Sequence, residues 1–363
     1  MTIPTIISLT PNRVWRTYLG GKMLDIREGK AEPQDSHFPE DWIASTTRAV
    51  NQGREEHTEE GLSRVEVDGE PHLLTELLSA HPHKLVGPAH YAQYGAKTQF
   101  LLKFLDSSIR LHIQAHPTVA FSQQHLNSNH GKTEAYVILA VRPEVEPYIF
   151  LGFQHPRPRE EFKRAVAGQD IATLESCFDK ITVQPGDVFI VPGGMPHAIG
   201  PGVLMIEIME PTDFVARLEF ERGGYVLPEA ARFMDRGIDF GMDMIEFKET
   251  SVEEIKAHYF CSPRMLNQQR GGEEYVLIDT EQTACFRVHR LRVSGSCEKR
   301  ADSFYVGIVT GGSGTLRAGD QELAVQTGDR FMIPFATETV TYQADEPLEV
   351  VLAFPPRTGV TSS

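Results

Sequence analysis

The chain has 363 residues, of which 40% are hydrophobic and 9% aromatic, proportions typical of a globular protein large enough for two domains. It carries 35 basic and 50 acidic residues, for a formal charge of −15, which argues against nucleic acid or an anionic membrane as the main partner. The four cysteines form no Cys-x-x-Cys pair, and no stretch reaches the length of a membrane span or forms a signal peptide. We therefore expect free thiols and a cytoplasmic protein.

The first hundred residues mix short apolar runs with turns. Residues 6–48 predict short strands joined by glycine turns. The charged stretch 54–61 has no periodicity and predicts a solvated loop, whereas the helical spacing over 73–78 predicts a short helix. The run 100–105 is apolar except for Lys103. It predicts a buried strand whose lysine needs a partner or a function.

The middle of the chain alternates helical and strand-like patterns. Residues 120–130 are polar and predict a loop or a short helix, and the apolar spacing over 156–179 predicts an interrupted helical segment. Apolar runs at 188–192 and 203–209 predict buried strands. An uneven apolar face over 228–247 predicts a further helical region.

From about Glu274 onward almost every segment is strand-like and bounded by glycine turns, a spacing typical of a β sandwich or barrel. This part also repeats an earlier motif, because residues 185–192 recur as 327–334 with Gly, Asp, Phe and Pro at equal spacing. In that register His197 falls opposite Thr339. We therefore predict two related β domains, one with a site and one without.

These patterns predict a mainly β protein in three parts. The parts are a catalytic β domain with a helical insertion near 156–179, a helical linker and a degenerate C-terminal β domain, at residues 1–225, 226–268 and 269–363 respectively.

Candidate metal ligands lie on three of the predicted strands. In an extended chain Gln114 shares a face with His116, and on the next strand Lys132 shares a face with Glu134. A further histidine, His197, follows a third strand. Imidazoles and a carboxylate suit zinc with an open position for water or substrate, although the amide oxygen is a rarer ligand and leaves manganese or iron open.

Three charged residues are candidates for catalysis. Lys132 would lie beside the metal, whose positive charge favours the neutral amine needed for proton transfer. Glu207 lies between two isoleucines, which predicts either a desolvated base or a partner of a structural cation. Arg217 also lies in an apolar context, where it would either stabilise an oxyanion or pair with Glu207.

At these residues the sequence resembles the type I mannose-6-phosphate isomerases, a zinc family of the cupin superfamily. The resemblance covers nearly the whole chain from Trp15 onward. Its motifs match in order and spacing: Gln114-Ala115-His116-Pro117, Gly131-Lys132-Thr133-Glu134, Pro185-Gly186-Asp187 through His197-Ala198, and Arg217 after Thr212-Asp213.

The resemblance implies two cupin-type jelly-roll domains and the interconversion of mannose 6-phosphate and fructose 6-phosphate in a monomer or homodimer. It assigns one zinc ion to Gln114, His116, Glu134 and His197, places Arg217 and Lys132 at the reacting carbons, and gives Lys103 a role in holding the phosphate. An aldose–ketose isomerisation passes through a cis-enediol and needs an electrophile, a counter-charge and a base. Lys132 and Glu207 both remain candidates for that base.

The sequence departs from the family at one position of interest. Two residues before the ligand glutamine the family commonly has a serine that contacts the phosphate, whereas this chain has His112. We expect His112 to contact the substrate, because histidine can donate to a phosphate. The alternatives are an isomerase of the same fold for an unphosphorylated or different sugar, and a cupin that binds sugar or metal without catalysis.

Overall fold

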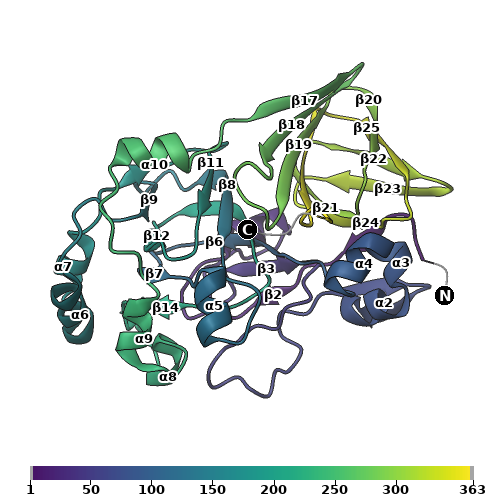
Figure 1. Ribbon diagram of the computed structural model, residues 1–363. Coiled ribbons are helices and arrows are strands. Elements are labelled where there is room, and N and C mark those ends of the chain that lie inside the picture. The colour runs from purple at the N-terminus through teal and green to yellow at the C-terminus, as the bar shows by residue number, and fades with distance from the viewer. Residues whose placement is uncertain (1–2, 360–363) are drawn as a thin grey trace.

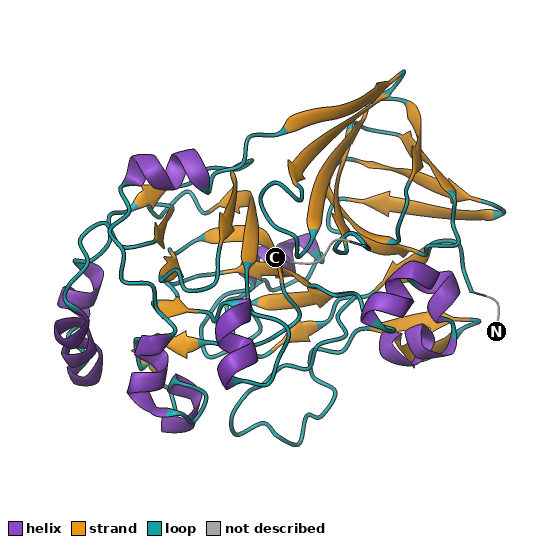
Figure 2. Cartoon of the chain, viewed as in Figure 1, coloured by secondary structure: helices purple, strands orange, loops and turns teal. Residues whose placement is uncertain are grey.

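The structure is a computed structural model that describes residues 3–359, and it is built around two β sandwiches (Figures 1 and 2). We call them the N-terminal and the C-terminal sandwich. The N-terminal sandwich has a five-stranded and a six-stranded sheet, and the C-terminal sandwich has a seven-stranded and a four-stranded sheet. The mainly β fold predicted from the sequence is confirmed.

The sheets of the N-terminal sandwich are antiparallel. The smaller one has the order β10 (Ile181–Thr182), β9 (Tyr148–Leu151), β12 (His197–Ile199), β7 (Gln114–Ala115), β14 (Ala216–Arg217). The larger one has the order β11 (Val188–Val191), β8 (Glu134–Val141), β13 (Val203–Met209), β6 (Leu101–Asp106), β3 (Glu40–Ile43), β2 (Arg13–Val14).

The C-terminal sandwich repeats this arrangement. Its larger sheet has the order β1 (Ile7–Leu9), β24 (Arg330–Ile333), β21 (Tyr305–Gly311), β26 (Leu348–Phe354), β19 (Arg287–Val293), β18 (Gly272–Ile278), β17 (Arg264–Gln269). Its smaller sheet has the order β20 (Ser296–Arg300), β25 (Thr339–Ala344), β22 (Ser313–Ala318), β23 (Gln321–Gln326). Strand β1 comes from the beginning of the chain, so the first residues of the predicted catalytic domain pair with the other sandwich. The domain boundaries themselves remain a prediction.

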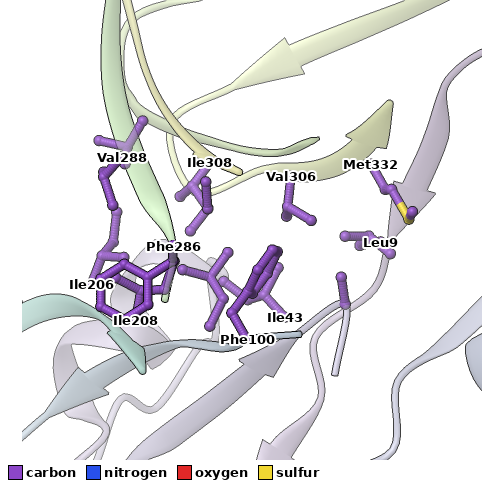
Figure 3. Close-up of a cluster of buried hydrophobic side chains, with 14 of the residues drawn as sticks. Leu9, Ile43, Phe100, Ile206, Ile208, Phe286, Val288, Val306, Ile308 and Met332 are labelled. Carbon is purple, nitrogen blue, oxygen red and sulfur yellow. The ribbon is translucent and has the colours of Figure 1, made fainter. Parts of the chain in front are cut away.

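The long apolar strands are explained by two cores. Side chains alternate between the faces of a strand, so Met205 of β13 lies in the core between the two sheets of its own sandwich, whereas Ile206 and Ile208 face the other way. In Figure 3 these two isoleucines lie beside Phe286 and Val288 of the C-terminal sandwich, in a core that both sandwiches share. Because both faces of β13 are covered, its sequence is a continuous apolar run.

Helices are confined to connections around the sheets. The predicted helix at 73–78 is α2, the predicted segment at 156–179 is the pair α6 and α7, and the region 228–247 holds α8 and α9. Their full set is α1 (Lys22–Arg27), α2 (Leu74–Ala80), α3 (Pro82–Leu85), α4 (Pro88–Tyr94), α5 (Val119–His125), α6 (Arg159–Gly168), α7 (Ile171–Glu175), α8 (Glu229–Arg232), α9 (Gly237–Asp243) and α10 (Val252–His258). Two small hairpins pair β4 (Arg64–Val67) with β5 (Glu70–Leu73) and β15 (Glu221–Arg222) with β16 (Tyr225–Val226). Within residues 3–359 no helix is long and apolar enough to cross a membrane.

One part of the N-terminal prediction was wrong. Residues 6–48 were expected to contain only strands and turns, but α1 forms there. Its first turn is held by a carboxylate from a distant strand, because Asp106 Oδ2 accepts hydrogen bonds from the backbone N–H of Gly21 (3.0 Å) and Met23 (2.7 Å). Such a long-range cap satisfies the free N–H groups at a helix start without any local sequence signal.

Candidate active site

The two sheets of the N-terminal sandwich bring the predicted residues together by strand register. On the smaller sheet Gln114 of β7 pairs with both His197 of β12 and Arg217 of β14. On the larger sheet Glu207 of β13 pairs with Lys103 of β6. These five residues, except for His197, line one cavity together with His112, Lys132 and Glu134. Residues predicted from five separate stretches of sequence therefore share one pocket.

The candidate metal ligands form a buried cluster. Potential ligand atoms of His116, Glu134 and His197 all lie within 4.8 Å of one another. His116 Nε2 lies 3.1 Å from Glu134 Oε1, and His197 Nε2 lies 3.5 Å from Glu134 Oε2. The carboxamide nitrogen of Gln114 lies 3.3 Å from His197 Nε2. Rotation of the amide group would present its oxygen to His197 instead.

The hydrogen bonds of the two histidines prepare them for a cation. His116 Nδ1 lies 2.7 Å from the carbonyl oxygen of Phe214, and His197 Nδ1 lies 2.9 Å from that of Met195. A carbonyl oxygen only accepts, so each Nδ1 carries the proton and each Nε2 presents its lone pair to Glu134. Burial lowers the pKa of His116 to about 4, which keeps its imidazole neutral. Two imidazole lone pairs facing a carboxylate fit a divalent metal ion such as zinc.

Lys132 lies within this cluster. Its Nζ is 2.8 Å from Glu134 Oε1 and 3.0 Å from His116 Nε2, so the ammonium group donates to the same atoms that would bind a metal ion. Burial alone would raise the pKa of Glu134, but His116 and Lys132 hold it well below its usual value. Lys132 therefore lies against two of the candidate metal ligands, and its catalytic role stays a prediction.

The buried lysine of β6 is explained by two carboxylates. Lys103 Nζ lies 2.6 Å from Glu207 Oε2 and 3.3 Å from Glu40 Oε2. Of the two roles considered for Glu207, pairing with a cation is therefore observed, but the partner is Lys103 and the alternative pair with Arg217 is wrong. Burial raises the pKa of Glu207 to about 7 in spite of the neighbouring lysine.

Arg217 differs from the other cations of the pocket. Arg16, Lys103 and Lys132 each form an ion pair with a carboxylate within 4 Å, whereas Arg217 Nη1 donates to the carbonyl oxygen of Ala231 at 2.7 Å. Within residues 3–359 no carboxylate lies within ion-pair distance of its guanidinium. Burial, together with the charge of Arg16, lowers its pKa to about 10. Arg217 is thus the cation of this pocket left free to pair with a substrate anion.

The pocket wall around Glu40 was not predicted from the sequence. This buried carboxylate accepts a hydrogen bond from Tyr18 Oη at 2.5 Å on one oxygen and from Trp42 Nε1 at 2.7 Å on the other. Arg16 Nε lies 3.4 Å from Glu40, and the same guanidinium forms a double hydrogen bond with Asp213 at 3.1 and 3.2 Å. The alternation Glu40-Asp41-Trp42 places Glu40 and Trp42 on one face of β3, which was a usable signal.

His112 is the residue whose surroundings differ most from expectation. Its Nδ1 lies 2.9 Å from the carbonyl oxygen of Glu219 and therefore carries a proton, and its buried Nε2 has no hydrogen-bond partner within residues 3–359. Burial and the charge of Arg217 lower the pKa of His112 to about 3. In this neutral form Nε2 is an acceptor, so the expected donation from His112 to a phosphate does not fit the geometry.

A jelly-roll sandwich with a buried His/Glu/His cluster in its first half defines a cupin-type protein with a candidate metal centre. No family model matches the chain. It is 28% identical over 253 residues to the mannose-6-phosphate isomerase of Streptococcus mutans, covering 69% of this chain and 72% of the relative. It is 26% identical over 235 residues to the probable mannose-6-phosphate isomerase GmuF of Bacillus subtilis, covering 64% of this chain and 68% of the relative.

Among solved structures, the mannose 6-phosphate isomerase of Bacillus subtilis superposes with a TM-score of 0.74 at 20% identity, covering 96% of this chain and 99% of that one. This likeness confirms the predicted cupin-type fold. The curated relatives confirm the resemblance to the mannose-6-phosphate isomerases and, with it, the prediction that the chain is an isomerase.

Proposed function

We propose that the protein is a metal-dependent aldose–ketose isomerase that interconverts mannose 6-phosphate and fructose 6-phosphate. The observation that carries the proposal is that Glu134 of the His116/Glu134/His197 cluster lines the same cavity as Arg217, the cation free of carboxylates. The isomerase relatives support the reaction, and the pocket supports the substrate class.

The charges of the pocket match a sugar phosphate once a metal ion is bound. Four cationic and four anionic side chains line the cavity, so its formal charge is zero: Arg16, Lys103, Lys132, Arg217, Glu40, Glu134, Glu207 and Asp213. A divalent ion would bring the total to about +2, and a phosphate monoester carries about −1.5 to −2 at neutral pH. The loaded pocket would therefore be complementary to the substrate anion.

The metal ion would be held by Gln114, His116, Glu134 and His197, and zinc is the ion that best suits two imidazoles and a carboxylate. When bound it would polarise the oxygens at C1 and C2 of the open-chain sugar. Side chains of the protein would carry out the proton transfers. A base removes the proton from C2 and returns it to C1, while a proton passes from O2 to O1 through the cis-enediol.

Glu207 is our proposal for that base. Its pKa is raised to about 7 by burial, close to the value that favours both removing and returning a proton at neutral pH. Arg217 would stabilise the negative charge of the enediolate, since its guanidinium is free of carboxylates. Lys103, which pairs with Glu207, would hold the phosphate or orient the base, and Lys132 remains the alternative base.

The test combines metal analysis with turnover. We expect the purified protein to carry about one divalent ion per chain and to lose isomerase activity on mannose 6-phosphate after chelation, with recovery on adding zinc. Arg217→Ala and Glu207→Gln should each lower kcat by about 10²-fold or more while leaving metal content unchanged. A metal-free protein of full activity, or one with metal but no turnover of any aldose, contradicts the proposal.

An unphosphorylated sugar is the second candidate, and His112 favours it. An acceptor nitrogen facing the pocket suits a sugar hydroxyl, which can donate, better than a phosphate oxygen, which cannot. Turnover on free mannose and on mannose 6-phosphate separates the two. Higher kcat/KM on free mannose in the wild type, reversed in His112→Ser, would establish the second candidate.

A further inference from the structure

The C-terminal sandwich reproduces the strand order of the sandwich that holds the active site. The order β11-β8-β13-β6-β3-β2 corresponds to β24-β21-β26-β19-β18-β17, and β10-β9-β12-β7 corresponds to β23-β22-β25-β20. Each strand of the active site, apart from the edge strand β14, thus has a counterpart at the same place in the second sandwich. The repeated Gly-Asp-x-Phe motif leads into β11 and β24, which agrees with this correspondence.

Residue pairs can therefore be compared across the two sandwiches. Phe189 pairs with Tyr136 in the first, and Phe331 pairs with Gly307 in the second. Two residues earlier on each strand, Tyr305 has the position of Glu134. Of the pairs that face the interior, Val340 with Lys299 has the place of His197 with Gln114, because Thr339 and Arg300 lie on the outer face of their strands.

The metal half of the site is therefore absent from the second sandwich. Lys299, Tyr305 and Val340 stand in place of the amide, the carboxylate and the imidazole. Neither Tyr305 nor Val340 offers the carboxylate or imidazole that a zinc site needs, and Lys299 adds a cation in place of the ligand amide.

The second sandwich retains the polar residues of the wall opposite the metal ligands. In the first sandwich Glu40 pairs with Leu105 and Trp42 pairs with Lys103, and in the second Glu274 pairs with Leu291 and Val276 pairs with His289. Glu274 and His289 thus have the positions of Glu40 and Lys103. The contact between them is also kept, because His289 Nδ1 donates to Glu274 Oε1 at 2.7 Å.

A lysine completes this buried polar group. Lys299 Nζ donates to the same Glu274 Oε1 at 2.6 Å. Glu274 and His289 are each only 5% exposed. Burial alone would raise the pKa of Glu274, but the hydrogen bonds from His289 and Lys299 hold it below its usual value. Oε1 accepts both hydrogen bonds. Oε2 accepts no hydrogen bond from residues 3–359.

A cavity of about 250 Å³ has Glu274 and Lys299 of this group in its lining. It is lined by Asn267, Gln269, Glu274, Glu298, Lys299 and Arg300. Glu274 and Lys299 correspond to Glu40 and Gln114, which line the active-site pocket. The lining residues come from β17, β18 and β20, and Gln269 Nε2 of the edge strand β17 donates to the carbonyl oxygen of Glu298 in the edge strand β20.

The lining residues point to an uncharged polar ligand. The lining includes two carboxylates, Glu274 and Glu298, and two cations, Lys299 and Arg300, so its formal charges cancel without a metal ion. Neighbouring acceptors and donors of this kind suit hydroxyl groups, each of which both donates and accepts. A phosphate would leave an excess negative charge beside the buried carboxylate, which is unfavourable.

We propose that this cavity is a second ligand site that binds an uncharged monosaccharide or polyol, with hydroxyl groups donating to Glu274 Oε2 and accepting from Lys299. The site is separate from the catalytic pocket and does not depend on the proposed reaction.

Hydrogen exchange of the full chain, followed by mass spectrometry with and without D-mannose, D-fructose or sorbitol, locates any such binding. We expect at least one of these probes to slow exchange in peptides covering 264–269 and 296–300. Glu274→Gln removes the buried charge, and Asn267→Trp fills the cavity from its exposed rim without touching the buried group. Both substitutions should abolish the protection at 264–300, whereas Glu273→Gln, on the opposite face of β18, should keep it.

The circular dichroism spectrum of each variant reports that the chain is folded, and we expect it to equal that of the wild type. The proposal is overturned if none of the three probes protects 264–300 in the wild type. It is also overturned if the protection persists in Asn267→Trp, or if only phosphorylated sugars produce it. Protection confined to the catalytic segments 111–116 and 132–136 would likewise count against a second site.

Discussion

At the scale of single residues, the active-site pocket depends on buried charges that compensate one another. Glu40 is the clearest case, because it contacts both Lys103 and Arg16 and also accepts from Tyr18 and Trp42. Burial alone would raise the pKa of Glu40, but the two cations hold it below its usual value. An ionised carboxylate therefore orients two cations on the wall opposite the candidate metal ligands.

The substitution Glu40→Gln tests this role. The new side chain would have the same shape but no charge, so Lys103 and Arg16 would lose their common partner. We expect kcat/KM on mannose 6-phosphate to fall by about 10²-fold, since small displacements of catalytic groups have effects of that size. Steady-state kinetics measures this loss, and metal analysis checks that the metal content is unchanged. Glu40→Asp is the control variant, because it keeps the negative charge. Unchanged kinetics in a folded Glu40→Gln protein would show that Glu40 has no positioning role.

His90 gives the protein a predictable dependence of stability on pH. Its Nε2 donates to the carbonyl oxygen of Lys97 at 2.8 Å, and its Nδ1 is buried without a partner in the described part of the chain. Burial lowers the pKa of His90, in spite of that hydrogen bond. The unfolded chain therefore binds a proton at this site at a higher pH than the folded chain does.

It follows that the contribution of His90 to stability is full above the ordinary histidine pKa of about 6.5 and declines as the pH falls below it. We expect the free energy of unfolding in urea to fall less steeply between about pH 7 and 5 in His90→Gln than in the wild type. Arg287 and Asp302 are among the charged residues that line the same cavity as His90. Identical slopes for the two proteins would contradict the prediction.

At the scale of elements, register decides which residues meet. Gly307 of β21 pairs with Phe331 of β24, and a methyl group added to Gly307 would lie 2.1 Å from the phenyl ring. The ring thus packs directly over the glycine in the core of the C-terminal sandwich. In the N-terminal sandwich the corresponding place is filled by Tyr136, whose ring packs edge-on against Phe189 at 5.1 Å.

Gly307→Val is therefore expected to displace Phe331 and to lower the free energy of unfolding by about 1–3 kcal/mol. Gly311→Ala on the same strand is the matched control, because its added methyl group would lie 4.0 Å from Glu349 Cβ. Denaturant unfolding of both variants measures the effect. Equal stability of the two variants would mean that the strand moves enough to admit the side chain.

At the scale of the whole molecule, the two sandwiches are joined by a shared apolar core and by a buried ion pair. Asp41 of β3 in the N-terminal sandwich pairs with Arg330 of β24 in the C-terminal one. Asp41 is 1% exposed and Arg330 is 8% exposed. Burial raises the pKa of Asp41 even with this arginine beside it. Removal of the carboxylate would leave a buried guanidinium without a counter-charge.

We expect Asp41→Ala to lower the free energy of unfolding by about 3–5 kcal/mol, the usual effect of breaking a buried ion pair by removing one partner. Glu322→Ala breaks the exposed pair with Arg317 and serves as the control, for which a change within about 1 kcal/mol is expected. Equilibrium unfolding monitored by circular dichroism compares them. A loss in Asp41→Ala no larger than that of the control would show that the pair does not stabilise the joined sandwiches.

Much of the fold and part of the candidate site were predictable from patterns among residues close together in the sequence. The alternation of side chains along strands placed Gln114 with His116 and Lys132 with Glu134, and the structure brings His197 to the same point. The repeated motif at 185–192 and 327–334 indicated two related halves, and the strand orders agree. Both signals are local, because strand geometry and turn chemistry depend on residues close in sequence.

Only the tertiary structure decided which distant residues meet. Glu40 with Lys103, Arg330 with Asp41, and Asp106 at the start of α1 are joined by pairing between strands far apart in the chain. The correspondence of Glu274 and His289 with Glu40 and Lys103 has the same origin, since no motif in the sequence marks it. Register across a sheet is set by the packing of entire faces, so a buried ion pair cannot be assigned until both of its strands are in place.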